Sequence, residues 1–384
     1  MSTTRRVLAF LAVGGALVAA GCGGGDHAGP SLAWQESSLP TPAGSRAVVR
    51  DAAYCDGQWY VVGATATSRV RTRPAVWSST DAVHWRAVRL DPGEDYYAAR
   101  AILGSVGCSR GRVAVLGAKS GGVHGMPRTA TWRQRPDGSL VAVRASYELY
   151  GGVKAVRVNR LVGGPRGWLI AGTRTSGAAV WRSRDAHSFR IEEGAPGLAD
   201  SGPSSTQGFD AAWHDGAWWV VGTSVDAAGS ETATSWTPAP ARGWTRHPLP
   251  GSGAIATAER AVELPEGLVA VGLDDQAFAA WTLAGGAWSP PVTFGGRDLD
   301  GSAAAYVVGL ASVGEEVAAT YSDGARFRLA VGRAGAPWPD VAPPASVPVT
   351  GDGQLTVAGG DGQFLLVADD GDGGRVWVAD APGG

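Results

Sequence analysis

The chain has 384 residues, of which 44% are apolar, 18% are charged, 58 are glycine and 16 are tryptophan. This length and apolar content suffice to bury a large core, and the abundance of glycine favours many short strands joined by turns over long helices. The formal net charge is −2, with both signs interspersed along the chain, which argues against a nucleic-acid partner.

Residues 1–21 have the layout of a secretory signal: a basic start, an apolar run over residues 7–20 and small residues at the end. The apolar run is too short to span a bilayer comfortably. The ending "AAGC" resembles the lipobox of bacterial lipoproteins, which implies a diacylglycerol on the sulfur of Cys22 after cleavage. A plain signal peptide and an uncleaved anchor are the alternatives. Residues 22–30, rich in glycine, then form a flexible tether to a folded domain over residues 31–384.

A repeat with a period near fifty residues organises the folded domain. The stretch "DAAYCDGQWYVVG" at 51–63 returns as "DAAWHDGAWWVVG" at 210–222. The apolar run that closes this motif recurs in seven units, ending at Gly63, Gly117, Gly172, Gly222, Gly272, Thr320 and Ala368. Short apolar runs at this period, separated by glycine and aspartate turns, are typical of propeller blades rather than helical solenoids. The sequence therefore predicts an all-β, seven-bladed β-propeller with four-stranded antiparallel blades.

Most units carry a tryptophan in a second apolar run. We interpret these rings as fillers between packed sheets rather than as a sugar-stacking surface. The seventh unit ends after its third strand, and the segment "SLAWQESSLP" at 31–40 reads like the fourth-strand segment "VHWRAVRLDP" at 83–92. The N-terminal strand is therefore predicted to complete the last blade and close the ring, which removes two sheet edges.

Two units contain the pattern Ser-x-Asp-x-x-x-aromatic, at Ser79, Asp81 and Trp85 and at Ser183, Asp185 and Phe189. The pattern resembles the Asp-box, or BNR repeat, of sialidase-type propellers, in which the aspartate stabilises the turn between the third and fourth strands. Both copies have alanine after the aspartate, where the family has glycine. The resemblance implies a structural role for these residues and says nothing of catalysis.

With Cys22 assigned to the lipid, Cys55 and Cys108 remain. A remaining pair in an oxidising compartment is most simply a disulfide. The two cysteines stand eight or nine residues before the glycines that close their apolar runs, at equivalent places in adjacent blades. We therefore predict a Cys55–Cys108 disulfide.

The sequence offers no strong catalytic or metal signature. It has no Gly-x-Ser-x-Gly elbow, its six histidines lack metal-ligand spacing, and "DDGDGG" at 369–374 lacks the closing glutamate of a calcium loop. The resemblance to sialidases implies an Arg-Ile-Pro motif, an arginine triad and a Tyr/Glu nucleophile pair. The nearest string, "RIEE" at 190–193, lies after an Asp-box and has glutamate in place of proline. We expect no cofactor and no metal ion, and favour a non-enzymatic role.

Counting twelve residues back from the end of each apolar run reaches one position near the start of each innermost strand. In four units this position is charged: Asp51, Arg160, Asp210 and Arg260. Two interpretations stay open, a structural circlet of ion pairs and the polar floor of a binding site. Tyr97 and Tyr150 lie on loops expected above this floor, where they would stack on a ligand or, alternatively, cover blade ends.

These features predict a monomeric lipoprotein, anchored to the extracytoplasmic face of the cell membrane, whose propeller binds a protein or carbohydrate partner without catalysis. The competing hypotheses are a sialidase-like glycoside hydrolase with unrecognised catalytic residues and a purely structural envelope scaffold.

Overall fold

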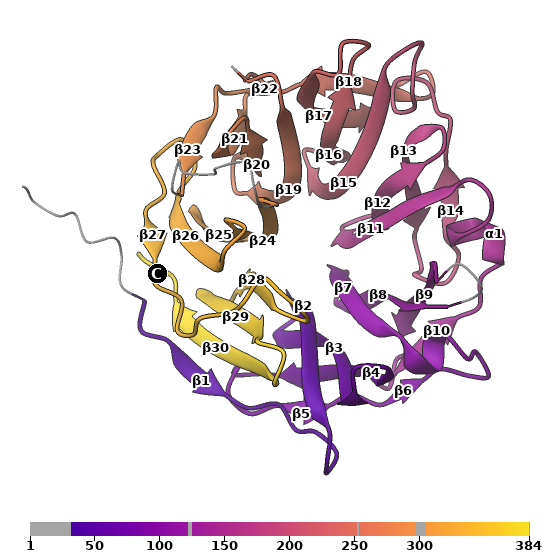
Figure 1. Cartoon of the computed structure of the whole chain (residues 1–384), viewed down its shortest axis with the longest axis vertical. Helices are drawn as coiled ribbons and strands as arrows, with labels where there is room; N and C mark the ends of the chain where they lie inside the picture. Colours follow the sequence, from indigo (N-terminus) through magenta and orange to yellow (C-terminus); the bar gives the residue numbers. More distant parts are fainter. Residues whose placement is uncertain (1–31, 122–124, 252, 296–303, 384) are drawn as a thin grey trace, which may run out of the picture.

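The computed structural model describes residues 32–121, 125–251, 253–295 and 304–383, and these form seven mainly antiparallel sheets around a central channel (Figure 1). The predicted seven-bladed β-propeller is confirmed. The predicted signal segment, Cys22 and the tether lie outside the described residues. Within the described ranges, no helix has the length and apolar character needed to cross a membrane.

The first three blades run outward from the channel, strand by strand. Blade 1 consists of β2 (Arg46–Cys55), β3 (Gln58–Ser68), β4 (Arg71–Ser79) and β5 (Arg86–Ala87). Blade 2 consists of β7 (Ile102–Ser109), β8 (Arg112–Ser120), β9 (Pro127–Gln134) and β10 (Leu140–Val143), with β6 (Leu90–Asp91) outside β10. Blade 3 consists of β11 (Ala155–Gly164), β12 (Gly167–Arg174), β13 (Gly177–Ser183) and β14 (Arg190–Glu192). The 3-10 helix η1 (Ala98–Arg100) precedes β7, and the short helix α1 (Tyr147–Tyr150) precedes β11.

The remaining blades repeat this plan. Blade 4 consists of β15 (Ser205–His214), β16 (Ala217–Val225), β17 (Glu231–Pro238) and β18 (Trp244–Pro248). Blade 5 consists of β19 (Ala256–Leu264), β20 (Gly267–Asp274), β21 (Ala277–Ala284) and β22 (Ala287–Trp288), and β23 (Val292–Phe294) also pairs with β21. Blade 6 consists of β24 (Tyr306–Val313), β25 (Glu316–Ser322), β26 (Phe327–Arg333) and β27 (Asp340–Val341). Blade 7 consists of β28 (Gln354–Gly360), β29 (Gln363–Asp369), β30 (Gly374–Asp380) and β1 (Gln35–Ser37).

Aspartate-glycine pairs make the tight turns between the first two strands of several blades. At Asp56–Gly57 the φ angles are 51° and 75°, and at Asp361–Gly362 they are 49° and 74°. Two successive residues with positive φ are what a type I′ hairpin turn requires, and its twist matches that of the strands it joins. These turns set the hairpin register that repeats around the ring.

The tryptophans of the second apolar runs are core residues, as interpreted from the sequence. Trp77, Trp132, Trp181, Trp236 and Trp281 are each at most 1% exposed, and Trp377 is 3% exposed. They pack with aliphatic side chains of the neighbouring blade, so each interface between blades holds its own hydrophobic cluster. Large flat rings at equivalent positions fill the space between twisted sheets.

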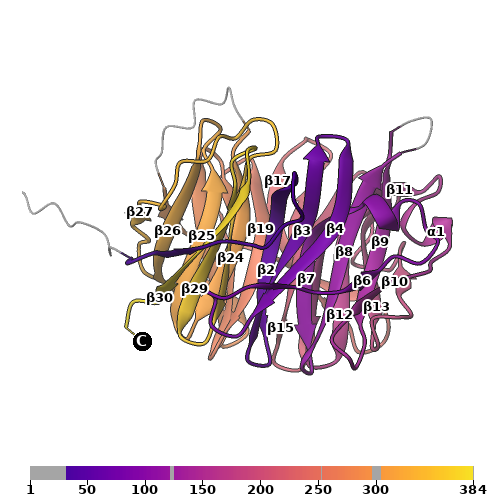
Figure 2. The ribbon, with the colours of Figure 1, turned by 90° about the horizontal axis from the view of Figure 1, so that it is seen from below.

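The N-terminal strand closes the ring, as predicted. β1 pairs antiparallel with β30, with Gln35 opposite Val378 and Ser37 opposite Val376. Figure 2 shows the indigo N-terminal segment running along the outside of the ring from blade 7 towards blade 1. There the Trp77 indole donates to the carbonyl of Pro40 (2.8 Å) and the Trp85 indole donates to the Ser37 hydroxyl (2.9 Å). The segment therefore bonds to two blades at once.

Candidate functional site

The innermost strands of blades 1 to 6 share a β-bulge at the mouth of the channel. Their registers shift between Val49 and Asp51, Leu103 and Ser105, Val158 and Arg160, Gly208 and Asp210, Ala258 and Arg260, and Val307 and Gly309. A bulge sets two consecutive residues opposite one partner and bends the strand. The residues skipped by these shifts are Arg50, Gly104, Asn159, Phe209, Glu259 and Val308, and all six line a cavity in the channel mouth.

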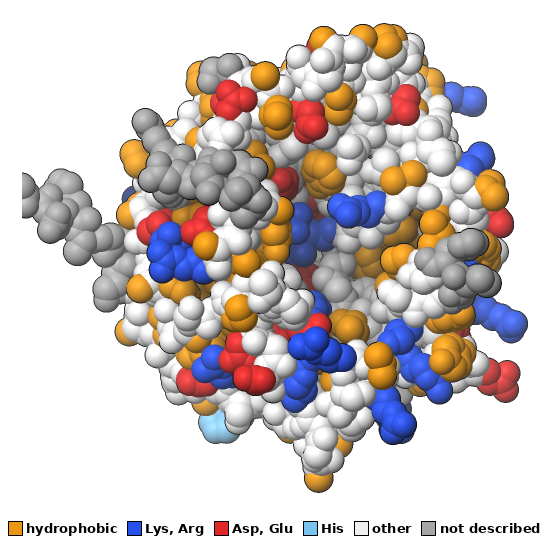
Figure 3. All heavy atoms as spheres, viewed as in Figure 1, with side chains coloured by type: hydrophobic (Ala, Val, Ile, Leu, Met, Phe, Trp, Pro, Cys, Tyr) orange, Lys and Arg blue, Asp and Glu red, His pale blue; other side chains and the backbone are white. Residues whose placement is uncertain are grey.

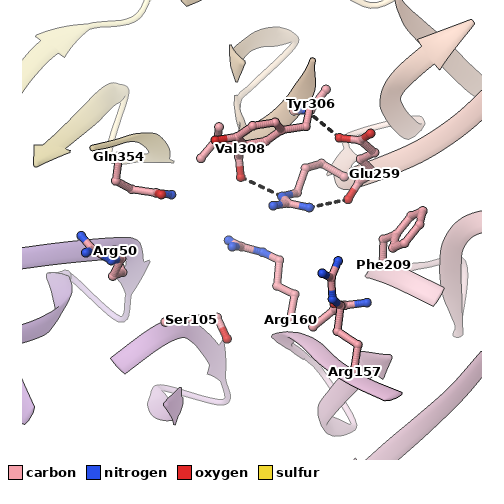
Figure 4. A pocket seen from close by; sticks show the side chains of 13 residues that line it. Arg50, Ser105, Arg157, Arg160, Phe209, Glu259, Tyr306, Val308 and Gln354 are labelled. Atoms are coloured by element: carbon pink, nitrogen blue, oxygen red, sulfur yellow. Dashed lines mark hydrogen bonds between the residues drawn. The ribbon is translucent and has the colours of Figure 1, made fainter. Parts of the chain in front are cut away.

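This cavity has a volume of about 350 Å³ and is rich in arginine: Arg50, Arg157, Arg160 and Arg260 all line it. Glu259, Phe209, Tyr306 and Gln354 contribute the rest of its functional side chains. Figure 3 shows the hollow at the centre of this face with basic side chains inside it, and Figure 4 shows Arg50, Arg160 and Gln354 converging on the cavity from different blades. The mouth of the channel is therefore a concave, mainly cationic site.

The two predicted aspartates link neighbouring blades beneath the cavity. The buried Asp51 carboxylate accepts the Val106 N–H (3.0 Å) and the Arg160 guanidinium (3.0 Å). The buried Asp210 carboxylate accepts the N–H groups of Ala211 (2.8 Å) and Ala261 (3.3 Å). Because Val106 and Ala261 belong to the next blade, each aspartate ties two innermost strands together. This geometry matches the first interpretation, a structural circlet, which is a ring of charged residues that holds the innermost strands together.

Arg160 completes this circlet while also facing the cavity. Besides its bond to Asp51, its guanidinium lies 3.7 Å from the Asp210 carboxylate. Burial alone would lower the pKa of Arg160, but the charges of Asp51 and Asp210 outweigh it and raise that pKa. Burial raises the pKa of Asp210, since loss of hydration outweighs the attraction of Arg160 and Arg260.

Arg260 has different partners. Its guanidinium donates to two backbone carbonyls, those of Val308 (2.7 Å) and Glu259 (2.7 Å). Burial and the nearby charge of Arg160 lower the pKa of Arg260. Among the described residues no ion pair within 4 Å involves Arg260 or the exposed Arg157. These two guanidinium groups are therefore the ones with charge available for a ligand.

Glu259 is the carboxylate that lines the cavity. One of its oxygens accepts the Val307 N–H (2.6 Å) and the other accepts the Thr257 hydroxyl (3.1 Å). Burial raises the pKa of Glu259 despite these bonds and the charge of Arg260. Burial also raises the pKa of Tyr306. No group of three or more potential metal ligands was found among the described residues.

Tyr97 and Tyr150 are not brought to this cavity. Tyr150, at the end of α1, is 6% exposed and packs 6.1 Å from the ring of Trp181, in the core between blades 2 and 3. Burial raises the pKa of its phenol. Tyr97 lies on the loop before η1, next to Tyr96 and Arg128. The expected grouping of these rings with the charged floor is wrong: Tyr150 covers a blade end, and Tyr97 belongs to the outer rim.

The loop at Asp81 has the hydrogen bonds of an aspartate-stabilised turn. One oxygen of Asp81 accepts the N–H groups of Val83 (2.9 Å) and His84 (2.8 Å) and the Ser79 hydroxyl (2.9 Å). The bonds from His84, followed by those from Val83 and Ser79, hold the pKa of Asp81 well below its usual range. The aspartate therefore fixes the turn between β4 and β5 by bonding to its own backbone.

The loop at Asp185 repeats this geometry. Its carboxylate accepts from the N–H groups of His187 (2.9 Å) and Ser188 (2.8 Å) and from the Ser183 hydroxyl (2.9 Å). The residue after each aspartate has positive φ, 59° at Ala82 and 55° at Ala186, which is a conformation that glycine adopts more easily. Both methyl groups are buried in hydrophobic clusters, and this burial offsets the strain.

The predicted disulfide is present: Cys55 and Cys108 are bonded, with their Cα atoms 5.5 Å apart. Cys55 ends β2 and Cys108 lies near the end of β7, so the bond joins the innermost strands of blades 1 and 2 at the ends away from the cavity.

Sequence reasoning missed most of the cavity. Arg50, Asn159, Phe209 and Glu259 directly precede the counted positions, and in an unbulged strand they would point away from the channel. Counting twelve residues back from Thr320 reaches Val308 in blade 6, whereas the register assigns the equivalent place to Gly309. The sequence did contain a pattern that could have predicted these residues: in several units a polar or bulky residue stands one position before the counted residue.

No protein-family model matches the chain, and no curated protein matches it. Several solved structures share its architecture. The β-propeller domain of the Trilobed protease from Pyrococcus furiosus is 10% identical, with a TM-score of 0.50, over 87% of this chain and 96% of that one. An endosialidase of phage phi92 is 9% identical, with a TM-score of 0.50, over 92% and 70%. An ancestral GH74 enzyme is 13% identical, with a TM-score of 0.54, over 92% of this chain and 51% of that one. At these identities the likeness shows the propeller fold alone.

Proposed function

We propose that this chain is a lipid-anchored extracytoplasmic binding protein that captures a carboxylate-bearing carbohydrate, or an acidic group of a protein partner, in the cavity of the channel mouth. The observation that carries the proposal is the arginine lining. Four guanidinium groups face one cavity, and two of them, Arg157 and Arg260, have no ion pair among the described residues. Guanidinium groups bind carboxylates with charge-assisted hydrogen bonds, which are strongest in a partly buried site.

Phe209 and Tyr306 support a carbohydrate in particular. Both line the cavity beside the arginines (Figure 4), and they offer apolar surface while the charged groups fix orientation. A concave site with an apolar wall and a few convergent polar groups is the usual form of a small-ligand site.

The test is titration calorimetry of the full chain with a panel of carboxylated oligosaccharides, their neutral counterparts and short acidic peptides. We expect binding of carboxylated members only. Arg157→Ala and Arg260→Ala should each weaken it at least tenfold, with an unchanged melting temperature for the exposed Arg157 and only a small loss of stability for Arg260, because neither guanidinium forms an ion pair within 4 Å among the described residues. Arg190→Ala, at an exposed position on the outer strand β14, is the control. Equal binding of neutral sugars, or unchanged affinity in both cavity variants, would refute the proposal.

A sialidase-like hydrolase is the second candidate, and one observation favours it: Glu259 and Tyr306 line the same cavity as the arginines. Two observations weigh against a hydrolase. The Glu259 oxygens are engaged by Val307 and Thr257, and the pKa of Tyr306 is raised, which is the reverse of activation. Turnover of any fluorogenic glycoside that Glu259→Gln abolishes would establish the hydrolase and overturn the binding role.

The anchor rests on the sequence of residues 1–22. A Cys22→Ala variant expressed in a lipoprotein-processing bacterium should lose its lipid and appear in the soluble extracytoplasmic fraction or the medium. Retention of this variant in the membrane fraction would contradict the lipid anchor.

A further inference from the structure

Exposed apolar side chains gather on one part of the channel-mouth face. Eight large hydrophobic side chains are exposed among the described residues, and six of them come from the mouth-side loops and strand ends of blades 1 to 3: Val70, Tyr96, Met126, Tyr147, Val153 and Val156. We call these six residues the blade 1–3 rim. Val70 is 74% exposed and Val153 is 95% exposed. Clustered exposed apolar groups mark interaction sites, whereas single ones do not.

A basic groove runs beside this rim. It has a volume of about 900 Å³ and lies between blades 1 and 2, with Arg71, Arg73, Arg100 and Lys119 in its lining and no acidic residue. No ion pair within 4 Å involves these four groups in the part of the chain that the structure describes. Figure 3 shows basic and hydrophobic side chains together on the lower right of this face. The groove shares no lining residue with the central cavity.

Two tyrosines of the blade 1–3 rim contact neighbouring arginine and tyrosine side chains. The Arg100 guanidinium lies 3.9 Å from the centre of the Tyr96 ring, and the Tyr96 and Tyr97 rings meet edge to face at 5.2 Å. Arg128 then lies over both Tyr97 (5.7 Å) and Tyr147 (4.4 Å). This chain of cation–π contacts orders the loops before a partner arrives, so less conformational entropy is lost on binding.

We propose that the blade 1–3 rim and its basic groove form a docking surface for an acidic protein segment that also carries apolar side chains. Arginine and tyrosine are among the residue types enriched at the centres of protein interfaces. The four cations of the groove, which form no ion pair among the described residues, favour a partner with carboxylates. The exposed Val70, Met126 and Val153 side chains favour a polypeptide over an anionic polysaccharide, which has no apolar side chains to cover them. This surface is separate from the central cavity and does not depend on its function.

The test measures fluorescence anisotropy of labelled twelve-residue peptides with the full chain. The probes are a peptide alternating glutamate with leucine, one alternating glutamate with serine, one alternating lysine with leucine, and polygalacturonate as an unlabelled competitor. We expect the Glu/Leu peptide to bind about tenfold or more tightly than the Glu/Ser peptide, and the Lys/Leu peptide not to bind. Polygalacturonate should compete poorly.

Variants separate the contribution of charge to the affinity from the contribution of apolar contact. Arg71 and Arg73 are exposed on β4, so R71E/R73E should keep the fold and lose at least tenfold in affinity. Val70→Ser should weaken only the Glu/Leu peptide. R112E/R190E, a matched double charge reversal at exposed positions elsewhere, should bind like the parent. Failure of the Glu/Leu peptide to bind, unchanged affinity in R71E/R73E, or polygalacturonate binding more tightly than the peptide would each overturn the proposal.

Discussion

The Arg160 guanidinium donates to the Asp51 carboxylate across 3.0 Å, although 109 residues separate them in the chain. The pair joins blade 3 to blade 1 at the channel mouth. Asp51 uses its other oxygen to hold blade 2 through Val106. The charged ring position therefore serves two purposes: its carboxylates link innermost strands, and its arginines supply the cationic surface of the cavity.

Arg160→Ala is expected to destabilise the fold far more than Arg260→Ala. Removing Arg160 leaves the fully buried Asp51 without its ion-pair partner, at a cost of about 3 kcal/mol, whereas Arg260 bonds only to carbonyls and its loss costs about 1 kcal/mol. Urea denaturation at pH 7 measures both. Equal losses in the two variants would contradict the distinction between a linking and a ligand-facing arginine.

Deleting residues 31–40 is expected to lower the free energy of unfolding by about 5 kcal/mol. The deletion removes the indole bonds to Ser37 and Pro40, the Ser37 bond to Ala82 and the buried Leu39, and it exposes the edge of β30. Ser37→Ala, which removes two of these bonds, should give a smaller loss of about 1 kcal/mol. A deletion variant with the parent's melting temperature would show that β1 contributes nothing to closure.

Replacing Cys55 and Cys108 by serine is expected to cost about 4 kcal/mol, because the bond closes a loop with a sequence separation of 53 residues. Reductant should destabilise the parent by a similar amount and leave the double variant unchanged. Thiol titration of the denatured, unreduced protein supplies the check, since reactive Cys55 or Cys108 would mean that the bond is absent.

Glu259→Gln is expected to stabilise the fold at neutral pH and to lose this advantage in acid. Burial raises the pKa of Glu259 above its ordinary value of 4.5, so the native state holds this proton more tightly than the unfolded chain does. The penalty for ionising it therefore builds as the pH rises from 4.5 and is complete above the raised pKa. Urea denaturation between pH 4 and pH 8 tests the sign. An advantage that grows on acidification would refute the assignment.

Periodicity predicted the ring and the blade count, because both depend on features that repeat with the blade. The closing strand was predicted from the likeness of residues 31–40 to residues 83–92, and the disulfide from the two cysteines that remain at equivalent places in adjacent blades. Counting back also located Asp51 and Arg160, which occupy one repeated position. It failed at Glu259 and Phe209, since a bulge adds a residue without leaving a mark in an alternating pattern. The prediction that Tyr150 faces a ligand was also wrong. The helix α1 places Tyr150 against Trp181, and contacts between blades are not encoded in any local spacing.

The pairing of Gln35 with Val378 sets the order of assembly. β1 is made before any blade, yet its partner strand is the last of blade 7, so ring closure cannot precede synthesis of β30. Pairings this distant in sequence slow folding, and until closure occurs the edge of β30 and the indole of Trp77 lack their final partners. A polypeptide released before that strand therefore keeps an open edge available to other chains, and closure of the ring requires both β1 and β30.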